Sequence, residues 1–496
     1  AAARISTALL LQRSASSFAA QPVSLARSSR PVSSTLLAAG SVPSAALPAQ
    51  IRTTGTRGMS GPSRGERSSR LSKFHSLGIP ARIDTLESAG FLTPEQKAAL
   101  TGAGLTLDGA DSMVENVVAV FGLPMGVSLN MVVNGTDVVV PMVVEEPSVV
   151  AAVSNVARMT RPEGFVASSD DPVMIGQMHV RHVADPSAAK AALEAAFPAF
   201  TAMAHEIQPN LVKRGGGIRG WEAKVLVYDE PGEVREESVV LNFFMDCRDA
   251  MGANMINTTA ERLAGEVERV SGGKVGLKIL SNLADRRLVR CKVLIPFDRL
   301  ATKNMEGKDV AEGIAAAYRF AYADPHRACT HNKGVMNGID PVILATGNDW
   351  RAIEAGAHAY AARDGQYRPL ASWKVRGEKL EGFIELPMQV GIVGGTIKSH
   401  PTASAALAIM SVTSAQHLGE IIAAVGLAQN LAALRALATE GIQRGHMSMH
   451  ARSLVARVLV DKPEELRNKV YEALLKTGNI KEDQVLQILA EMGEGK

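Results

Sequence analysis

The sequence has little cysteine and few aromatic residues. Its three cysteines, Cys247, Cys291 and Cys329, are far apart and odd in number, which fits neither a disulfide framework nor a zinc ribbon. Aromatic residues make up 4% of the 496 residues and hydrophobic residues 46%, so aliphatic side chains must fill the core. A chain of this length supports one large or two to three medium domains. We expect a soluble, reduced protein with no bound metal.

Acidic residues are missing from the first 65 positions. That leader holds seven of the 53 Lys and Arg, which leaves 46 basic against 50 acidic residues in the rest of the chain. The basic excess therefore belongs to the leader and implies no nucleic-acid partner. An acid-free segment rich in Arg, Ser and Ala is typical of an organelle transit peptide, although a disordered tail has the same composition. We expect residues 1–65 to be a transit peptide, with the mitochondrion favoured over the plastid.

Long apolar runs are also missing, so we expect no membrane span. The chain instead shows short strand, turn and helix patterns in succession. The β-branched residues of 117–120 and 138–140 predict strands, and Asn134-Gly135 predicts a hairpin turn. Residues 172–285 form a plausible second domain, and residues 286–440 return to long Ala-rich helices.

Within residues 172–285 the pattern predicts a helix from Ala188 to about Val212 and strands over Ala223–Tyr228 and Ser238–Asp246. A further helix is expected from about Thr258, because Thr258 and Glu261 match a capping box. The tail shows two amphipathic helices.

The richest chemistry lies in His331–Asp340 and in Ala345–Arg351, which place a lysine and aspartates in an otherwise apolar region. Charged residues among apolar ones are usually paired or functional. If Lys333 and Asp349 share a pocket, the lysine can stabilise an oxyanion and the aspartate can set its charge and position. This pattern indicates an enzyme active site.

Other segments carry weaker signals. Gly215–Gly220 has the letters of a dinucleotide fingerprint, but a helix precedes it and a strand follows, so we reject a Rossmann fold. The junction from Asp246 to Asn257 runs from a strand through a Gly-containing loop into a helix, which could hold a phosphate or be an ordinary capped junction. Glu145-Glu146 could supply a raised-pKa acid or merely complement a helix dipole. His446, expected in a loop, could be a proton donor or structural.

Taken together, these segments resemble the hydroxymethylglutaryl-CoA reductase family, in its bacterial-type second class, over about residues 74–460. The motifs that carry the resemblance are 115–118, Pro141–Ser148, Asp249–Asn254, His331–Asp340, Ala345–Arg351, Gly441–Met447 and His450–Arg452.

The resemblance implies reduction of (S)-3-hydroxy-3-methylglutaryl-CoA to mevalonate and CoA by two hydride transfers, a step of isoprenoid biosynthesis. The implied catalytic residues are an acid, an oxyanion-stabilising lysine, a tuning aspartate and a proton donor to the CoA thiolate, namely Glu146, Lys333, Asp349 and His446. The implied substrate-binding residues are Ser148, Arg327 and Asn337. The implied cofactor-binding residues are Asp249, Gly252, Asn254 and Asn282.

The resemblance also implies an α+β multidomain fold. A large, mainly helical domain (66–171 and 286–440) would bind the CoA ester, and a small ferredoxin-like, non-Rossmann domain (172–285) would bind NAD(P)H. Residues 441–496 would form a C-terminal flap carrying His446. The expected assembly is a homodimer or a higher even oligomer, with Asp349 supplied by the neighbouring subunit.

The chain departs from the family pattern at two places. Gln208, followed by Lys213 and Arg214, stands where NADH-using members have an aspartate for the ribose hydroxyl, and this favours NADPH over NADH. His75 stands where some members have an arginine for the CoA phosphate. The alternatives are NAD-linked oxidation of mevalonate and an inactive CoA-ester-binding homologue.

Overall fold

The computed structural model describes residues 67–102, 104–439 and 441–493, and of 442–449 only the helical backbone. The predicted leader, 1–65, lies outside the described residues. The described part of the chain begins with short helices whose apolar side chains pack with Val139 and Ile409. Thr93 and Gln96 form the capping box that starts the second of the full helices. These elements are η1 (Phe74–Ser76), α1 (Ile79–Ser88), α2 (Pro94–Thr101) and α3 (Leu107–Asp111).

A two-stranded hairpin leads into the first core helix. Strands β1 (Met125–Val133) and β2 (Thr136–Val143) pair antiparallel, and α4 (Val149–Thr160) follows. The turn is Asn134-Gly135, and both residues have positive φ, 49° and 75°, as a two-residue hairpin turn requires. The predicted hairpin is confirmed. The strand predicted at 117–120 is wrong, because this segment finds no partner strand and Val118 is 95% exposed.

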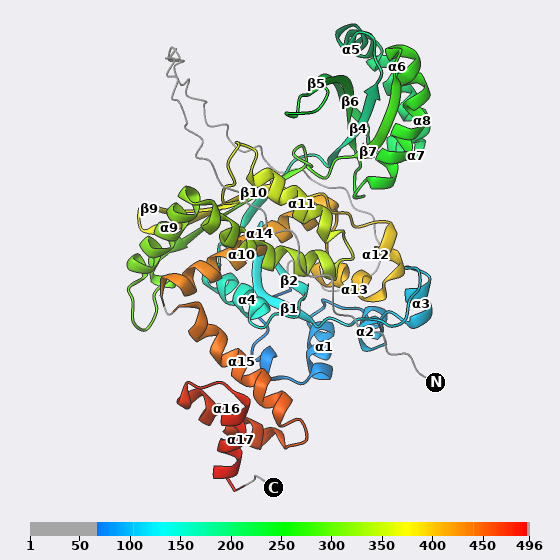
Figure 1. The fold of residues 1–496 in the computed structure, drawn as a ribbon. Coiled ribbons are helices and arrows are strands. Elements are labelled where there is room, and N and C mark those ends of the chain that lie inside the picture. Colours follow the sequence, from blue (N-terminus) through cyan, green and yellow to red (C-terminus); the bar gives the residue numbers. More distant parts are fainter. Residues whose placement is uncertain (1–66, 103, 440, 494–496) are drawn as a thin grey trace, which may run out of the picture. The chain divides into compact units, whose positions relative to one another are not determined.

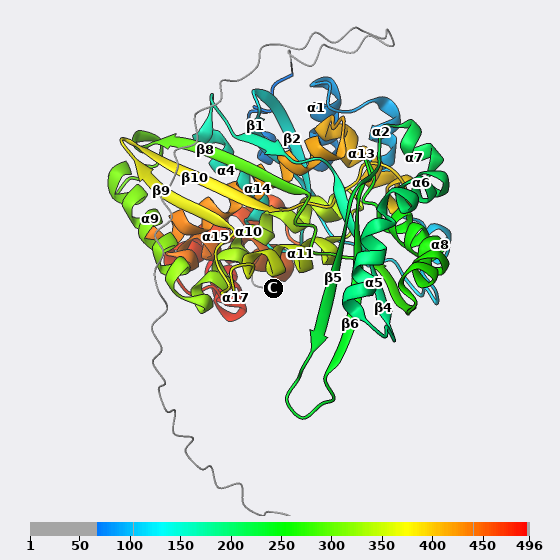
Figure 2. The same ribbon diagram turned by 90° about the horizontal axis from the view of Figure 1, so that it is seen from above.

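The main core forms around a four-stranded antiparallel sheet of order β3-β8-β10-β9. Figure 2 shows β8, β10 and β9 side by side. Its strands are β3 (Val166–Ser169), β8 (Leu288–Pro296), β9 (Ala371–Arg376) and β10 (Lys379–Pro387). The helices of this region are η2 (Phe297–Arg299), α9 (Gly307–Ala323), α10 (Pro325–Ala345), α11 (Trp350–Ala361), α12 (Gly395–Ser399), α13 (Pro401–Met410) and α14 (Ala415–Ala438).

Helix α14 packs against α10, α4 and β8. Two glycines let α10 and α14 approach closely. A Cβ on Gly338 would lie 2.9 Å from the Val425 carbonyl oxygen, and a Cβ on Gly426 would lie 2.8 Å from Ile339. Within the described residues α14 alone is long and apolar enough to cross a membrane, with a mean hydropathy of 1.6, and 67% of that window is buried inside the protein. Burial to this extent is the environment of a core helix.

A second four-stranded antiparallel sheet has the order β5-β6-β4-β7, and its helices share one hydrophobic cluster with it. Figure 1 shows α5, α6 and α8 beside this sheet. Its elements are β4 (Val173–Arg181), α5 (Pro186–Ala195), α6 (Phe197–Ile207), α7 (Pro209–Lys213), β5 (Gly217–Tyr228), β6 (Glu236–Asp246), α8 (Ala253–Ser271) and β7 (Lys274–Leu280).

Two predictions for this region are wrong in detail. The single helix expected from Ala188 to Val212 is three helices, because prolines stand in the first turn of α6 and of α7. Helix α8 begins at Ala253, so Thr258 lies inside the helix and is not its cap. Both expected strands are present as parts of β5 and β6.

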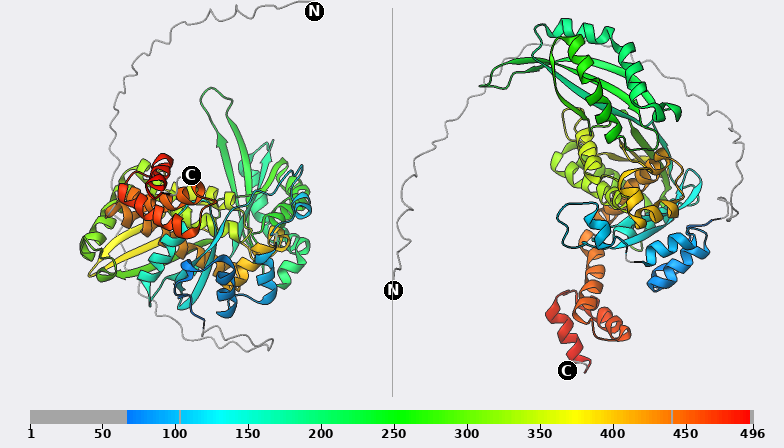
Figure 3. Two further views of the ribbon diagram at one scale, coloured as in Figure 1. Left: turned by 90° about the horizontal axis from the view of Figure 1, so that it is seen from below. Right: turned by 90° about the vertical axis from the view of Figure 1, so that its right-hand side faces the viewer.

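The C-terminal helices form a small cluster of their own. Residues such as Leu454, Val470 and Ile488 pack together, and Figure 3 shows the three helices in orange to red. The two amphipathic tail helices predicted from the sequence are confirmed. The elements are α15 (Ile442–Val458), α16 (Glu464–Thr477) and α17 (Glu482–Glu491).

Candidate active site

The connection from β2 to α4 carries Glu146 and Ser148. Ser148 precedes α4 with a left-handed φ of 77°, which is a strained conformation for a residue with a side chain. Its Oγ is buried and has no hydrogen-bond partner among the described residues. Buried polar atoms in proteins are nearly always hydrogen-bonded, so this hydroxyl is free to bind a ligand.

Helix α10 brings two predicted residues to Glu146. Lys333 and Asn337 are four positions apart and therefore lie on one face of the helix. The Lys333 Nζ lies 3.2 Å from Glu146 Oε2, and Asn337 Nδ2 donates to the same oxygen at 3.5 Å. The structure thus unites a cation, an amide and a carboxylate from two distant segments.

The opposite side of α10 is anchored by buried polar residues. His331 Nε2 lies 3.0 Å from the Ala371 carbonyl oxygen, and Asn332 bonds to the backbone of Arg368 and Leu370. Burial lowers the pKa of His331 to about 4, so this imidazole is neutral at physiological pH. These bonds hold the helix turn that presents Lys333.

A cavity of about 550 Å³ is lined by the three predicted substrate-binding residues and by two of the four predicted catalytic residues. Its volume suits a small organic ligand. Burial lowers the pKa of the Arg327 guanidinium. Arg327 and Lys333 are two basic side chains in the wall that also holds Glu146. The predicted residues that line the cavity are Glu146, Ser148, Arg327, Lys333 and Asn337.

Asp349 lies apart from this cavity. It caps the N-terminus of α11 by accepting hydrogen bonds from the backbone N–H of Arg351 and Ala352, and its carboxylate also pairs with Arg351 Nε at 3.4 Å. Within the described part of one chain, no hydrogen bond or ion pair joins Asp349 to Lys333 or Glu146. The expectation that Lys333 and Asp349 meet is therefore not met within one subunit.

A second cavity, of about 1010 Å³, shares Glu146 and Ser148 with the first. His75 and Arg82 line it. The Arg82 guanidinium donates to the backbone carbonyls of Phe74 and His75, which fixes a cation at this place. Sequence reasoning missed Arg82, because an arginine on a short amphipathic helix carries no signal of its own.

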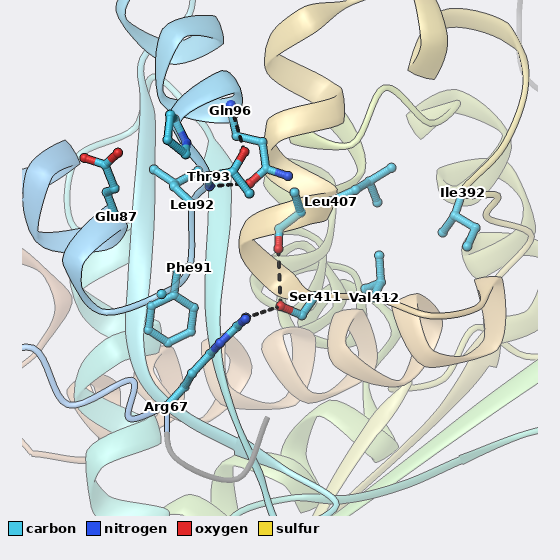
Figure 4. Close-up of a pocket in the computed structure, with 13 residues that line it drawn as sticks. Arg67, Glu87, Phe91, Leu92, Thr93, Gln96, Ile392, Leu407, Ser411 and Val412 are labelled. Carbon is cyan, nitrogen blue, oxygen red and sulfur yellow. Dashed lines mark hydrogen bonds between the residues drawn. The ribbon is translucent and has the colours of Figure 1, made fainter. Parts of the chain in front are cut away.

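A third cavity, of about 760 Å³, lies between α2 and α13. Figure 4 shows Arg67 donating to Ser411 Oγ and the Thr93–Gln96 capping pair along its wall. None of the predicted site residues lines it, so it is not the candidate active site.

The predicted cofactor residues gather where β6 leads into α8 and where β7 ends. Gly252 precedes α8 with φ 109°, and a Cβ there would lie 2.6 Å from Cys247 Sγ. No side chain caps this 19-residue helix, so its first N–H groups are available to a phosphate. Asn254 and Asn282 are exposed, and Asp249 accepts a hydrogen bond from Ala415 N at 2.9 Å. This junction therefore offers free N–H groups at a helix start and exposed amide side chains near it.

The Gly215–Gly220 segment follows α7 and opens β5. A helix thus precedes the glycines and a strand follows them, which is the reverse of a dinucleotide-binding turn. The rejection of a Rossmann fold is confirmed. In the described residues no group of three or more His, Cys, Asp or Glu could hold a metal ion.

His446 lies on helix α15, and its side chain is outside the described residues. The prediction that it sits in a loop is wrong. Gly441, with φ 79°, already provides the break after α14, and the following residues continue as a helix.

Comparison with known proteins agrees on one family. The family model of hydroxymethylglutaryl-coenzyme A reductase matches residues 78–451. The Archaeoglobus fulgidus 3-hydroxy-3-methylglutaryl-coenzyme A reductase is 44% identical over 87% of this chain and 97% of its own length. The class II enzyme of Streptococcus pneumoniae, solved bound to NADPH in open conformations, matches with a TM-score of 0.71 and 40% identity over 74% of this chain and 99% of that chain.

These relatives correct the predicted localisation. They come from archaea and bacteria, as does a probable reductase of Borreliella burgdorferi that is 33% identical over 69% of this chain. None of these relatives is an organelle enzyme, and the organelle prediction is wrong. An acid-free, Arg-rich composition is shared by import signals and by solvated tails, and it could not distinguish them.

The matched family model covers most of the chain, and the fold is the mixed α+β multidomain fold of the class II enzyme. The motifs named from the sequence lie inside the matched range, except that the last one, His450–Arg452, ends one residue beyond it. This chain belongs to the hydroxymethylglutaryl-coenzyme A reductase family.

Proposed function

We propose that this chain reduces (S)-3-hydroxy-3-methylglutaryl-CoA to mevalonate and CoA in the mevalonate pathway. The observation that carries the proposal is the contact of Lys333 and Asn337 with Glu146 inside one ligand-sized cavity. Reduction of a thioester creates negative charge on the carbonyl oxygen and then requires a proton there. A lysine and a carboxylic acid 3.2 Å apart supply both.

NADPH supplies the hydride in each of the two reductions. Lys333 stabilises the oxyanion of the reacting carbonyl by charge, and Glu146 delivers the proton to that oxygen. Arg327 and Asn337 bind the carboxylate and hydroxyl of the acyl group, and the unpartnered Ser148 hydroxyl donates to the same group. Lys333 lies on α10, and Glu146 lies just before α4, so both catalytic groups are held by rigid elements.

The second cavity suits the long arm of CoA. It joins the first at Glu146–Ser148, so a thioester placed at that junction has its acyl group on one side and its thiol arm on the other. Arg82 and His75 line the arm's cavity, and Arg82 supplies the phosphate-binding cation that the His75 position lacks.

The active protein is a homodimer in which Asp349 enters the cavity of the neighbouring subunit. Two observations support this proposal. Within the described residues no hydrogen bond or ion pair joins Asp349 to Lys333 of its own chain, and the segment 114–123 exposes large apolar side chains. A contiguous exposed apolar segment marks an interaction surface. Its exposed residues are Val114, Val118, Val120, Phe121 and Leu123.

The two domains have different roles, and we keep the boundaries predicted from the sequence. Residues 66–171 with 286–440 bind the CoA ester, and 172–285 bind the dinucleotide on a ferredoxin-like sheet. The proposal for 172–285 is supported by an element order βαββαβ, in which α5–α7 take the place of the first helix, around the sheet β5-β6-β4-β7. Gln208 donates its amide to Met255 O and Thr259 Oγ1, so no carboxylate stands there to repel a ribose phosphate, and the preferred cofactor is NADPH.

Residues 441–496 act as a flap that brings His446 to the departing CoA thiolate. The separate hydrophobic cluster of α15–α17 supports this proposal, because a unit with its own core can move as a body. His446 protonates the thiolate and thereby prevents its return to the aldehyde.

Initial rates with NADPH and NADH in both directions test the function. We expect reduction of hydroxymethylglutaryl-CoA with NADPH to be the fastest reaction. NAD-linked mevalonate oxidation without NADPH turnover would reverse the assigned direction, and no turnover with either cofactor would identify a CoA-ester-binding homologue.

A further inference from the structure

A short segment after β10 connects the cofactor loop to Asp349. We call residues 387–392 the strap. On its cofactor side, the backbone N–H of Ile392 donates to the Asp249 carbonyl oxygen at 2.9 Å, and that of Met388 donates to the Arg287 carbonyl oxygen at 3.0 Å. The strap therefore follows the loop that carries the predicted cofactor residues.

Arg287 binds the strap to this loop. Its side chain is buried, and its guanidinium donates to the carbonyl oxygens of Ala250 at 3.1 Å, Met251 at 3.3 Å and Val390 at 2.5 Å. It forms no ion pair with an acid among the described residues, and burial lowers its pKa to about 10. A buried cation satisfied only by main-chain oxygens is costly, and the planar guanidinium fixes all three carbonyls in one geometry.

Gly391 brings the two backbones into direct contact. A Cβ at this position would lie 2.7 Å from Met251 N and 3.2 Å from the Asp249 carbonyl oxygen. Its φ is not in the left-handed region, so the requirement for glycine comes from space and not from backbone conformation. Any side chain here must displace the cofactor loop.

The other side of the strap is bonded to the Asp349 region. The Asn348 side chain accepts from Gly391 N at 2.7 Å and donates to Gly391 O at 3.0 Å. The buried Gln389 amide donates to the carbonyl oxygens of Asn282 at 3.0 Å and Ala352 at 2.8 Å. Ala352 lies in the helix turn that Asp349 caps.

We propose that the strap sets the position of the cofactor loop relative to Asp349, and that Arg287, Asn348 and Gly391 are positioning residues for hydride transfer. None of these residues is placed in contact with the reactants. The inference rests on the proposed function, because it assumes that the cofactor loop and Asp349 serve one reaction. Displacements of about 1 Å far from the reacting atoms can slow a reaction about 100-fold, so a rigid link between the two groups has a direct effect on rate.

The test variant is Gly391→Ala, with Gly265→Ala as the matched control, because a Cβ at Gly265 meets nothing within 4 Å. Each variant is compared with wild type for kcat, for both KM values and for the Kd of NADPH, measured by nucleotide fluorescence without substrate. We expect Gly391→Ala to lower kcat about 10- to 100-fold, to raise the NADPH Kd, and to leave the KM for hydroxymethylglutaryl-CoA unchanged. The control should match wild type.

Asn348→Ala supplies a second measurement, and it carries the test if Gly391→Ala does not fold. This change removes the bonds on the Asp349 side only, so kcat should fall while the NADPH Kd stays at the wild-type value. The isotope effect on kcat with NADPH deuterated at the transferred position should rise, because hydride transfer becomes slower than product release. A purely structural role would lower the melting temperature and leave this isotope effect unchanged.

The proposal is overturned if Gly391→Ala keeps the wild-type NADPH Kd and kcat, or if Asn348→Ala keeps the wild-type kcat and isotope effect. Failure of the proposed function gives a different result, namely a wild-type protein that does not reduce hydroxymethylglutaryl-CoA. In that case the NADPH Kd of Gly391→Ala still tests the cofactor side of the strap.

Discussion

The two halves of the candidate site are organised differently. On one side, Glu146, Lys333 and Asn337 already touch within a single chain and line one cavity. On the other side, Asp349 caps α11, and among the described residues its carboxylate bonds to the first residues of its own helix. One half is complete in the subunit, and the other half lacks its partners.

The difference suggests what each half requires. The Lys333 half depends on the packing of α10 against α14, which two glycines permit, so it should form as soon as the subunit folds. In the proposed dimer the Asp349 half depends on the strap and on a neighbouring subunit, so it should respond to changes in assembly. Variants on the two sides should therefore fail in different ways.

Lys333→Ala should give the largest effect. The variant loses the charge that stabilises the oxyanion, so kcat should fall about 1000-fold. The Lys333 side chain is 62% exposed. The melting temperature of the variant should therefore stay near that of the wild-type protein. Steady-state rates and thermal unfolding check both statements, and an unchanged kcat would remove the lysine from the mechanism.

Glu146→Gln should give the next largest effect. The amide keeps the shape of the side chain but cannot deliver a proton, so kcat should fall about 100-fold. Binding of hydroxymethylglutaryl-CoA, measured by calorimetry, should persist. A variant that turns over normally but binds weakly would show that Glu146 only binds substrate.

Ser148→Ala should act on substrate binding. The hydroxyl has no partner in the described residues, so its removal breaks no internal hydrogen bond and should not lower the melting temperature. If it binds the acyl group, the KM for hydroxymethylglutaryl-CoA should rise about tenfold. A drop in stability with an unchanged KM would contradict this assignment.

The anchoring of α10 predicts a pH dependence of stability. The folded-state pKa of His331 is about 4, below its ordinary value of 6.5, so between these values the unfolded chain binds a proton that the folded chain does not. The stabilisation is present above pH 6.5 and is lost as the pH falls through 4, by about 3 kcal/mol. Urea unfolding of wild type and His331→Gln should show this slope only in wild type.

Local patterns in the sequence predicted much of the fold. Asn134-Gly135 is a hairpin turn because both residues adopt positive φ readily. The strand expected at 117–120 failed because a strand needs a partner, which local pattern does not show.

The site was predicted through motifs and not through geometry. The sequence identified Lys333 and Glu146, which are 187 positions apart in the chain. Their contact depends on the packing of α10 beside the end of β2. It did not indicate Arg287 or Gln389, and it gave no role to Asn348, because their partners are main-chain atoms of other segments. A contact with distant backbone leaves no residue pattern to find.

The central claim is that Lys333 and Asp349 serve one site formed by two subunits. Mixing the inactive variants Lys333→Ala and Asp349→Ala, with subunit exchange, tests it most directly. The account predicts that activity returns to about a quarter of the wild-type value, because half of the randomly paired dimers are mixed and each mixed dimer holds one intact site. Mixtures that stay inactive while mixed dimers are shown to form would contradict the account, because both residues would then act within the same subunit.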